Sequence, residues 1–355
     1  MSRLIRDDMH EIFPTTFNRL VPGNILIQEI KMRSLKVLLL PLKGHFQPWC
    51  DDVIQAIGDS HQLSVFDPSR PISTQFDGID VVIDHGGSVG TRRMMDASTK
   101  ARLWQILGTG FDHFDLEYIR GLKIPVANCP GQFSSAALAE SAMMFILMLA
   151  RRYRQSAANF KSGVLYQPLS FELANQSLGI IGLGASGQEL ARRAKAFGMK
   201  ILAIDARAIE SQILVELQPD FMGSPSDIDR IISEVDFLSL HLHLNPETRH
   251  IIDARRIALM KPTAYLINVA RGELVDEQAL YQALVNGKLG GSGLDAFTEE
   301  PPNPQAPVFQ LPNVVVTPHV AGATYQTSRQ RAACAAQNVD RIAQDLEPFY
   351  RIDKN

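Results

Sequence analysis

The sequence predicts an α/β fold with two doubly wound, parallel-sheet domains (Rossmann/flavodoxin-like). From residue 36 onwards, short apolar segments alternate with helical patterns, which is typical of parallel sheets covered by helices. A glycine-rich motif near residue 182 opens a second series of the same alternation. The length of 355 residues fits about two domains.

The first series contains short apolar segments that we expect to be strands. They lie at 37–40, 63–66, 81–83, 103–107 and 124–127. A long helix is expected at 135–154, and its apolar residues point in nearly all directions. Such a helix is expected between domains or in a dimer contact. The residues before the first strand show no clear period, so 1–34 is expected to be an N-terminal extension.

The glycine-rich motif lies between a predicted strand at 178–181 and a predicted helix at 188–197. It is a GxGxxG sequence, formed by Gly182, Leu183, Gly184, Ala185, Ser186 and Gly187. The first glycine permits a tight turn, the second lets backbone approach a pyrophosphate, and the third lets the helix pack closely on the strand. The N-terminus of the helix then offers N–H groups and the positive end of its dipole to the phosphates. The motif therefore predicts a dinucleotide site.

The strand expected at 200–205 ends in an acid that indicates which dinucleotide binds. The carboxylate of Asp205 suits the ribose hydroxyls of NAD and repels the 2′-phosphate of NADP. Arg207 weakens this prediction, because an arginine two residues on can pair with a phosphate, although a surface charge is its more common role. NAD is therefore favoured over NADP.

Further strands are expected after Asp205, and polar residues follow several of them. The strands lie at 235–240, 264–268, 293–295 and 314–317, helix starts near 245–247 and 275–277, and a final helix at 325–345. In a doubly wound fold, ligands bind outside the carboxyl ends of the strands. The polar residues at these ends are His241, His243, Asn268, Arg271, Asp295, Glu300 and His319.

Three of these residues supply what a hydride transfer requires. Reduction of a carbonyl by a nicotinamide needs a proton donor for the forming alkoxide and a group that orients the carbonyl. His319 is the best donor, because imidazole changes charge near physiological pH. Glu300 would favour its charged form, and Arg271 would hold a substrate carboxylate by two hydrogen bonds. Their shared placement favours catalysis over the structural role of a lone histidine or arginine.

The composition argues against several functional classes. The net charge is −3 and the arginine pairs are scattered, unlike the clustered positive charge of nucleic-acid binding. The most apolar segment, 142–150, is too short to span a bilayer, and the N-terminus lacks the apolar core of a signal peptide. The three cysteines lack paired spacing, which indicates reduced thiols and a cytoplasmic protein.

Blocks in the second half of the chain resemble the signature blocks of D-isomer-specific 2-hydroxyacid dehydrogenases. They are Asn-Val-Ala-Arg-Gly-Glu-Leu-Val-Asp-Glu at 268–277, Gly-Leu-Asp-Ala-Phe with Glu-Pro in 293–301, and Thr-Pro-His-Val-Ala-Gly at 317–322. Segments at 108–112, 128–130 and 139–140 resemble the region between the domains of that family. The resemblance covers about residues 36–345.

The resemblance implies that Arg271 binds substrate, that His319 is the acid/base and that Glu300 is its partner. It also implies that Asp295 contacts the nicotinamide end and that residues 269–270 line the cofactor. The expected cofactor-binding residues are Gly182, Gly184, Ala185, Ser186, Gly187, Asp205, His241, Val269, Ala270 and Asp295.

The resemblance further implies how the domains are divided. The substrate domain would be split between 35–128 and 323–355, and the NAD-binding domain would occupy 129–322. The active site would lie in the cleft between them. Members of the family are usually homodimers built around the long helix.

The expected substrate loop departs from the family pattern. Where the family often has Arg-Ser, this chain has Asp84-His85-Gly86-Gly87. Loss of the arginine argues against a phosphorylated or strongly anionic substrate, while the two glycines can still offer N–H groups to a carboxylate. The expected substrate-binding residues are therefore His85, Gly86, Gly87 and Arg271.

Two further departures concern histidines. His241-Leu-His243 stands where the family tends to have His-x-Pro. The pair could bind a metal, but no third ligand lies nearby in the sequence, and no metal is expected. His113 replaces a common asparagine and puts the detailed substrate pocket in doubt.

The favoured function is NAD-dependent reduction of a small 2-keto acid, such as glyoxylate or hydroxypyruvate, or oxidation of the matching D-2-hydroxy acid. A second hypothesis is an NAD(H)-sensing interaction protein, like the co-repressors of this superfamily, which resemble the dehydrogenases in the same blocks. Dehydrogenation of formate or phosphite is less favoured, because Thr317-Pro318 and Glu300-Pro301 fit the hydroxyacid pattern better.

Overall fold

The computed structural model describes residues 33–42, 47–85 and 90–354. Within these ranges the chain forms one sheet of five strands and one of seven, and every strand pairing is parallel. The predicted α/β class with two parallel sheets is confirmed. The expected extension at 1–34 lies almost entirely outside the described residues.

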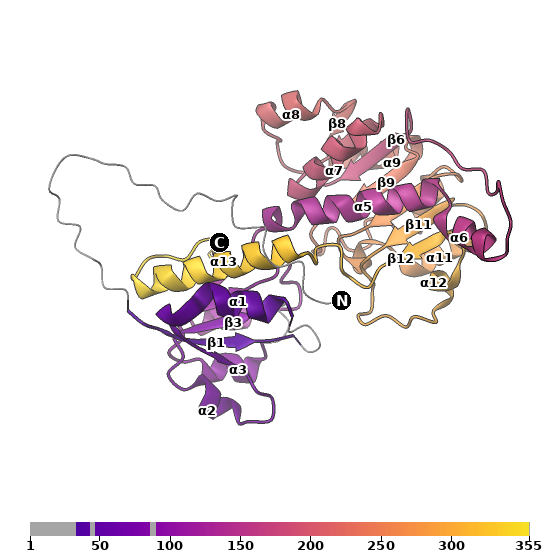
Figure 1. Ribbon diagram of the computed structural model, residues 1–355. Coiled ribbons are helices and arrows are strands. Elements are labelled where there is room, and N and C mark those ends of the chain that lie inside the picture. The colour runs from indigo at the N-terminus through magenta and orange to yellow at the C-terminus, as the bar shows by residue number, and fades with distance from the viewer. Residues whose placement is uncertain (1–32, 43–46, 86–89, 355) are drawn as a thin grey trace, which may run out of the picture. The chain divides into compact units, whose positions relative to one another are not determined.

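The five-stranded sheet has the order β2-β1-β3-β4-β5, which is the flavodoxin-like order. Its strands are β1 (Lys36–Leu40), β2 (Gln62–Val65), β3 (Val81–Asp84), β4 (Leu103–Ile106) and β5 (Val126–Ala127). Its helices are α1 (Trp49–Ile57), α2 (Ile72–Phe76), α3 (Arg92–Ala97) and α4 (Leu116–Gly121). The last helix of the chain, α13 (Tyr325–Ala343), packs against α1 (Figure 1). The C-terminal segment therefore returns to this sheet.

The seven-stranded sheet has the order β12-β11-β10-β9-β6-β7-β8, and the chain changes direction across the sheet between β6 and β9. Its strands are β6 (Ser177–Ile181), β7 (Lys200–Ile204), β8 (Phe221–Gly223), β9 (Phe237–Leu240), β10 (Tyr265–Asn268), β11 (Gly291–Leu294) and β12 (Val314–Val316). Its helices are α7 (Ala185–Ala196), α8 (Ser211–Leu217), α9 (Ile228–Glu234), α10 (Ala254–Leu259), α11 (Glu277–Val285) and α12 (Pro307–Gln310). This is the Rossmann arrangement, in which a ligand binds at the point of reversal.

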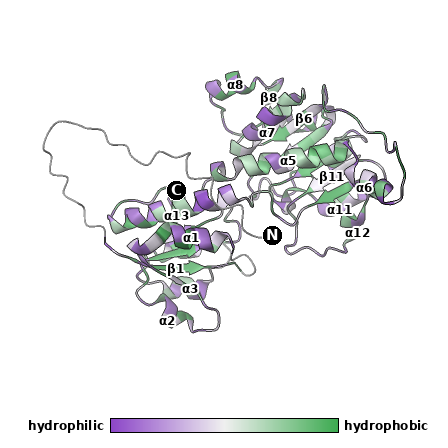
Figure 2. Cartoon of the chain, in the orientation of Figure 1, coloured by the Kyte–Doolittle hydropathy of each residue, from purple (hydrophilic) through white to green (hydrophobic). Residues whose placement is uncertain are grey.

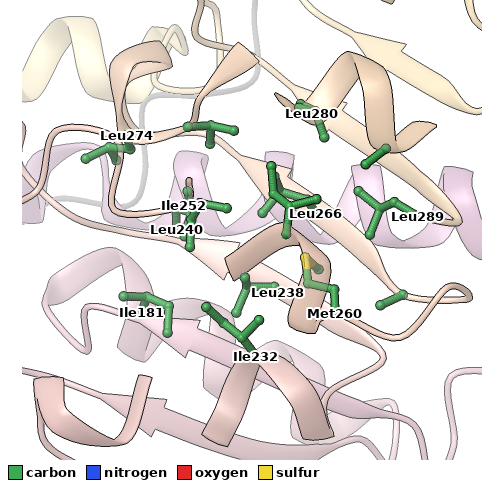
Figure 3. Packing of buried hydrophobic residues seen from close by; sticks show 14 of the residues in the cluster. Ile181, Ile232, Leu238, Leu240, Ile252, Met260, Leu266, Leu274, Leu280 and Leu289 are labelled. Atoms are coloured by element: carbon green, nitrogen blue, oxygen red, sulfur yellow. The ribbon is translucent and has the colours of Figure 1, made fainter. Parts of the chain in front are cut away.

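A close-packed apolar layer covers one face of the seven-stranded sheet. Figure 3 shows Leu238 and Leu240 of β9 beside Leu266 of β10, with Ile232 of α9 packed against them. All four side chains are fully buried. Each contributes about 1.5–3 kcal/mol of transfer free energy. Because the strands beneath this layer are all parallel, the polar residues that follow them emerge at one edge of the sheet.

The predicted long helix at 135–154 is wrong at its C-terminal end. The helix α5 spans Ser135–Ala150, and Figure 2 shows it as largely apolar. Arg152 then adopts a left-handed conformation with φ 48°, and a second helix, α6, spans Tyr153–Lys161. A non-glycine residue with positive φ cannot continue an α-helix, and the apolar pattern alone did not reveal this break.

Two other local expectations differ from the structure. The helix start expected near 245–247 is wrong, because Asn245 caps a turn through its side chain, which accepts from the backbone of Glu247 and Thr248, and α10 begins only at Ala254. The start near 275–277 is confirmed, since Asp276 accepts from the Ala279 N–H as the N-cap of α11. No helix among the described residues is both long enough and apolar enough to cross a membrane.

Candidate active site

The glycine turn between β6 and α7 has the geometry that the motif predicts. Gly182 has φ 98°, and a Cβ there would lie 2.5 Å from the carbonyl oxygen of His241. A Cβ on Gly187 would lie 2.2 Å from the carbonyl oxygen of Gly182. Any other residue at these two positions would clash with backbone. The turn ends at Gly184, the N-cap residue of α7, and so fits a dinucleotide pyrophosphate at a helix N-terminus.

Asp205 follows β7 and is paired with Arg207. The arginine donates to the carboxylate from Nε and Nη2, each at 3.0 Å, and from its backbone N–H at 2.9 Å. Burial acts to raise the pKa of Asp205, but the hydrogen bonds and charge of Arg207 outweigh it and the pKa is lowered. A Cβ on Gly184 would lie 3.3 Å from Nη2 of Arg207, so the guanidinium lies beside the glycine turn. A ribose at Asp205 would therefore meet Arg207 as well.

His241 follows β9 and is held between two hydroxyl groups. Its Nε2 lies 3.0 Å from Oγ of Ser239, and its Nδ1 lies 2.9 Å from Oγ of Ser186. Burial lowers the pKa of His241 to about 4. The imidazole is therefore neutral at physiological pH and links β9 to the glycine turn through Ser186. Its neighbour in the sequence motif, His243, is exposed.

His319 follows β12 and is paired with Glu300. Its Nδ1 lies 2.8 Å from each carboxylate oxygen of Glu300. Burial acts to raise the pKa of Glu300, but the hydrogen bond and charge of His319, with a smaller contribution from Arg271, lower it. The three residues predicted to be catalytic therefore lie near one another. Their arrangement provides an acid/base with a carboxylate partner, and a cation nearby.

The turn that carries His319 is held by a buried carboxylate. His319 has φ 55°, an uncommon conformation for a residue other than glycine. The Asp295 carboxylate accepts from the backbone N–H groups of Val320 and Ala321, both at 2.8 Å, and from the hydroxyl of Thr317. Burial raises the pKa of Asp295 although these bonds oppose it. Asp295 therefore fixes the backbone on both sides of His319.

Arg271 follows β10, and its guanidinium is held in place by two hydrogen bonds. Nε donates to the Asp112 carboxylate at 2.7 Å, and Nη1 donates to the carbonyl of Ala270 at 2.8 Å. Asn268 donates to the Arg271 carbonyl at 2.7 Å and so fixes the backbone. A Cβ on Gly110 would lie 1.5 Å from Nη2, so a side chain there would displace this guanidinium.

Part of the expected substrate loop lies outside the described residues, namely Gly86 and Gly87. His85 is buried at its start, with its ring against the Trp49 ring at a centroid distance of 5.5 Å and an angle of 65°. Val269 and Ala270, expected to line the cofactor, are buried after β10.

Several contacts of the site escape sequence reasoning. Asp112 is a carboxylate partner of Arg271 from 159 residues away, and Ser239 becomes notable only through its contact with His241. Arg331 reads as a surface charge on an amphipathic helix, yet its Nε is buried. The chain contains no local signal for any of these, because each depends on packing between distant elements.

Comparison with known proteins agrees with this geometry. The model of the D-isomer specific 2-hydroxyacid dehydrogenase NAD-binding domain matches residues 143–321. A hydroxypyruvate reductase of Thermotoga maritima is 36% identical over 76% of this chain and 85% of its own length. A glyoxylate reductase of Thermococcus onnurineus is 32% identical over 90% of this chain and 92% of its own length.

The chain belongs to the D-isomer specific 2-hydroxyacid dehydrogenase family.

A solved family member, a D-lactate dehydrogenase of Aquifex aeolicus complexed with NAD and lactic acid, has the same fold. The match covers 90% of this chain and 99% of that protein, with a TM-score of 0.76 and 27% sequence identity. A D-3-phosphoglycerate dehydrogenase of Methanocaldococcus jannaschii is 37% identical over 74% of this chain, which spans about half, 49%, of that longer protein. As a family member the chain is an NAD-dependent 2-hydroxyacid dehydrogenase, and the sensing-protein alternative is not favoured.

Proposed function

We propose that the chain reduces a small 2-keto acid to the D-2-hydroxy acid with NADH, and catalyses the reverse oxidation, with His319 as acid/base. The observation that carries this proposal is the contact of His319 with Glu300 beside Arg271. Glyoxylate and hydroxypyruvate are the first substrates to test, because the relatives described above carry those names.

The chain's own residues divide the work of the reaction. NADH, when bound, supplies the hydride. Arg271 holds the substrate carboxylate and polarises the adjacent carbonyl, since guanidinium binds carboxylates by two hydrogen bonds. His319 delivers a proton to the developing alkoxide, and Glu300 stabilises the imidazolium before that transfer. Asp295 is a positioning residue, because it holds the turn that orients the imidazole.

The cofactor would be held by the glycine turn, Asp205 and the backbone after β10. The expected contacts are Gly182, Gly184, Ala185, Ser186, Gly187, Asp205, His241, Val269, Ala270 and Asp295. NADH would be used in preference to NADPH, because Asp205 remains charged at neutral pH. The Arg207 guanidinium beside it is the residue on which any use of NADPH would depend.

The proposed organisation has a split substrate domain, 35–128 plus 323–355, and an NAD-binding domain, 129–322, with the active site in the cleft between them. Two contacts support the return of the C-terminal segment to the substrate domain. The helix α13 packs on α1, and the Ile352 N–H donates to the Val126 carbonyl at 2.9 Å. We also propose a homodimer, supported by an apolar groove beside α5 that Met143, Met144, Leu147, Met148 and Phe197 line. A cytoplasmic location is supported by the three cysteines, which are all buried free thiols.

The test is NADH oxidation, followed by its absorbance, against a panel of glyoxylate, hydroxypyruvate and pyruvate. Turnover of at least one of them is expected, together with loss of both turnover and substrate affinity in Arg271→Met. NADH binding without oxidation of any 2-keto acid would contradict the proposal and favour a sensing protein. The Arg230→Met variant is a matched control, because Arg230 pairs with Glu234 on an exposed helix surface.

A further inference from the structure

Arg331 of α13 is a partly buried cation with few partners. Its Nε is buried and has no hydrogen-bond partner among the described residues. Nη2 lies 3.4 Å from the Ser134 hydroxyl, which is a long hydrogen bond, and the guanidinium carbon lies 5.5 Å from the centre of the Trp49 ring. Within the described part of the chain, no carboxylate forms an ion pair with it. Leaving a buried charge without a counter-charge costs free energy, so the arrangement is best explained by a ligand.

Another partly buried arginine shows what a structural role looks like in this chain. Arg102 also has one buried nitrogen without a partner, Nη1. Its Nη2, however, pairs with the carboxylate of Asp345, so its charge is neutralised within the protein. Arg331 has the buried nitrogen but lacks the carboxylate, and this difference points to an anion from outside the chain.

The surroundings of Arg331 connect it to the residues proposed to bind substrate. The Trp49 ring that it faces also packs against His85, at the start of the expected substrate loop. Burial lowers the pKa of Arg331, and the positive charge of Arg271 adds to that effect. Arg271 is paired with Asp112, whereas Arg331 has no carboxylate partner among the described residues, and a second cation of this kind favours an anionic ligand.

A second buried polar atom without a partner in the described part of the chain belongs to Thr109, the residue before Gly110. The hydroxyl of Thr109 is buried and has no hydrogen-bond partner among the described residues. Its neighbour Gly110 is the residue on which a Cβ would touch the Arg271 guanidinium. A buried hydroxyl and a buried guanidinium nitrogen, both without partners, are the groups that a carboxylate satisfies.

We propose that Arg331 binds a second carboxylate of the substrate, so that the preferred substrates are 2-keto dicarboxylates. This rests on the proposed function, in which Arg271 binds the carboxylate next to the reacting carbonyl. An arginine-free substrate loop favours an uncharged substrate tail, but Arg331 supplies from α13 the cation that this loop lacks. The Trp49 ring contacts both His85 and the Arg331 guanidinium.

The test compares kcat/KM for oxaloacetate and 2-oxoglutarate with kcat/KM for glyoxylate and pyruvate, at one pH and at saturating NADH. The wild type is expected to prefer a dicarboxylate. Arg331→Met keeps most of the side-chain volume and removes the charge, so it is expected to lower kcat/KM for dicarboxylates about 10- to 100-fold, since a hydrogen bond to a charged group contributes about 1.5–3 kcal/mol. The value for glyoxylate is expected to stay within about threefold.

Two further variants keep the test decisive if Arg331→Met lowers stability. Arg331→Lys retains a cation and is expected to retain part of the dicarboxylate preference. Arg102→Met removes the other partly buried arginine and is expected to leave the preference unchanged. A melting-temperature increase caused by 2-oxoglutarate in the presence of NAD, present in the wild type and absent in Arg331→Met, gives a readout independent of turnover.

Three results would overturn the inference: no dicarboxylate preference in the wild type, an unchanged preference in Arg331→Met, or an equal loss for both substrate classes. These results are distinct from failure of the proposed function. If glyoxylate is reduced and the reaction depends on His319, the proposed function holds whatever the dicarboxylate result. If no 2-keto acid is reduced, the proposed function itself fails.

Discussion

His319 and His241 each follow a strand of the seven-stranded sheet, yet their surroundings are opposite. The His319 side chain is 43% exposed and contacts both oxygens of the Glu300 carboxylate. His241 lies mostly within the protein, between the hydroxyls of Ser239 and Ser186. A carboxylate partner favours the charged imidazole, whereas burial among neutral groups favours the neutral one.

The contrast teaches that a position just after a strand places a histidine at the ligand-binding edge of the sheet. The groups that contact its imidazole then decide whether it can transfer a proton. An imidazole that can gain and lose a proton beside a carboxylate suits acid/base work. An imidazole that is neutral at physiological pH suits positioning, because it can donate from one nitrogen and accept at the other without changing charge. His241 is therefore a positioning residue for the glycine turn, and His319 is the residue proposed to transfer the proton.

The largest expected effect is that of His319→Asn. It removes the proton donor, so kcat for 2-keto acid reduction should fall by about 10²- to 10⁴-fold. The Kd for NADH, measured by fluorescence titration, should change little because the glycine turn is untouched. If kcat stayed within tenfold of the wild-type value, another group would have to donate the proton. His319 and His241 would then not differ in the way proposed.

The second effect concerns stability in acid and belongs to His241 alone. Because its folded-state pKa of about 4 lies below the unfolded value, the unfolded chain binds more protons at low pH. Stability should therefore fall as pH drops from about 6.5 towards 4, by at most about 3 kcal/mol, since one pKa unit corresponds to about 1.4 kcal/mol. Urea unfolding across this range should show a weaker pH dependence in His241→Asn. An identical pH dependence in both proteins would show that His241 is not buried as a neutral imidazole.

The third effect is a change in the pH profile of Glu300→Gln. The lowered pKa of Glu300 means that its carboxylate is charged at neutral pH and stabilises the imidazolium of His319. Without that charge, reductive activity should begin to fall at a lower pH than in the wild type. The measurement is kcat/KM from pH 5 to 9. Superimposable profiles would mean that the Glu300 carboxylate does not influence proton transfer by His319. The matched control is Glu299→Gln, which changes the exposed neighbour of Glu300.

The smallest expected effect is that of Ser186→Ala, which removes one hydrogen bond between the glycine turn and His241. The Kd for NADH should rise by about two- to tenfold, because a single hydrogen bond contributes about 0.5–1.5 kcal/mol. The kcat at saturating NADH should be nearly unchanged. A large loss of kcat with an unchanged Kd would instead make His241 part of the reaction and remove the distinction drawn above.

Much of the fold could be predicted because the signals are local. Apolar segments of strand length and the glycines at 182, 184 and 187 determine their own backbone geometry through sterics. The break at Arg152 and the short edge strand β8 could not be predicted in this way. Arg152 has no side-chain preference for positive φ, and β8 is only half-buried, so neither leaves a strong pattern.

The sequence by itself determined the fold class, the glycine turn and the grouping of Arg271, Glu300 and His319, because strand ends in a parallel sheet meet at one edge. Only the tertiary structure decided that His241 is neutral and that Arg207 covers the Asp205 carboxylate. It also decided that Nε of Arg331 is buried without a partner among the described residues, although its helix reads as amphipathic. The physical reason is that burial and charge partners depend on groups far apart in the chain, which no local pattern records.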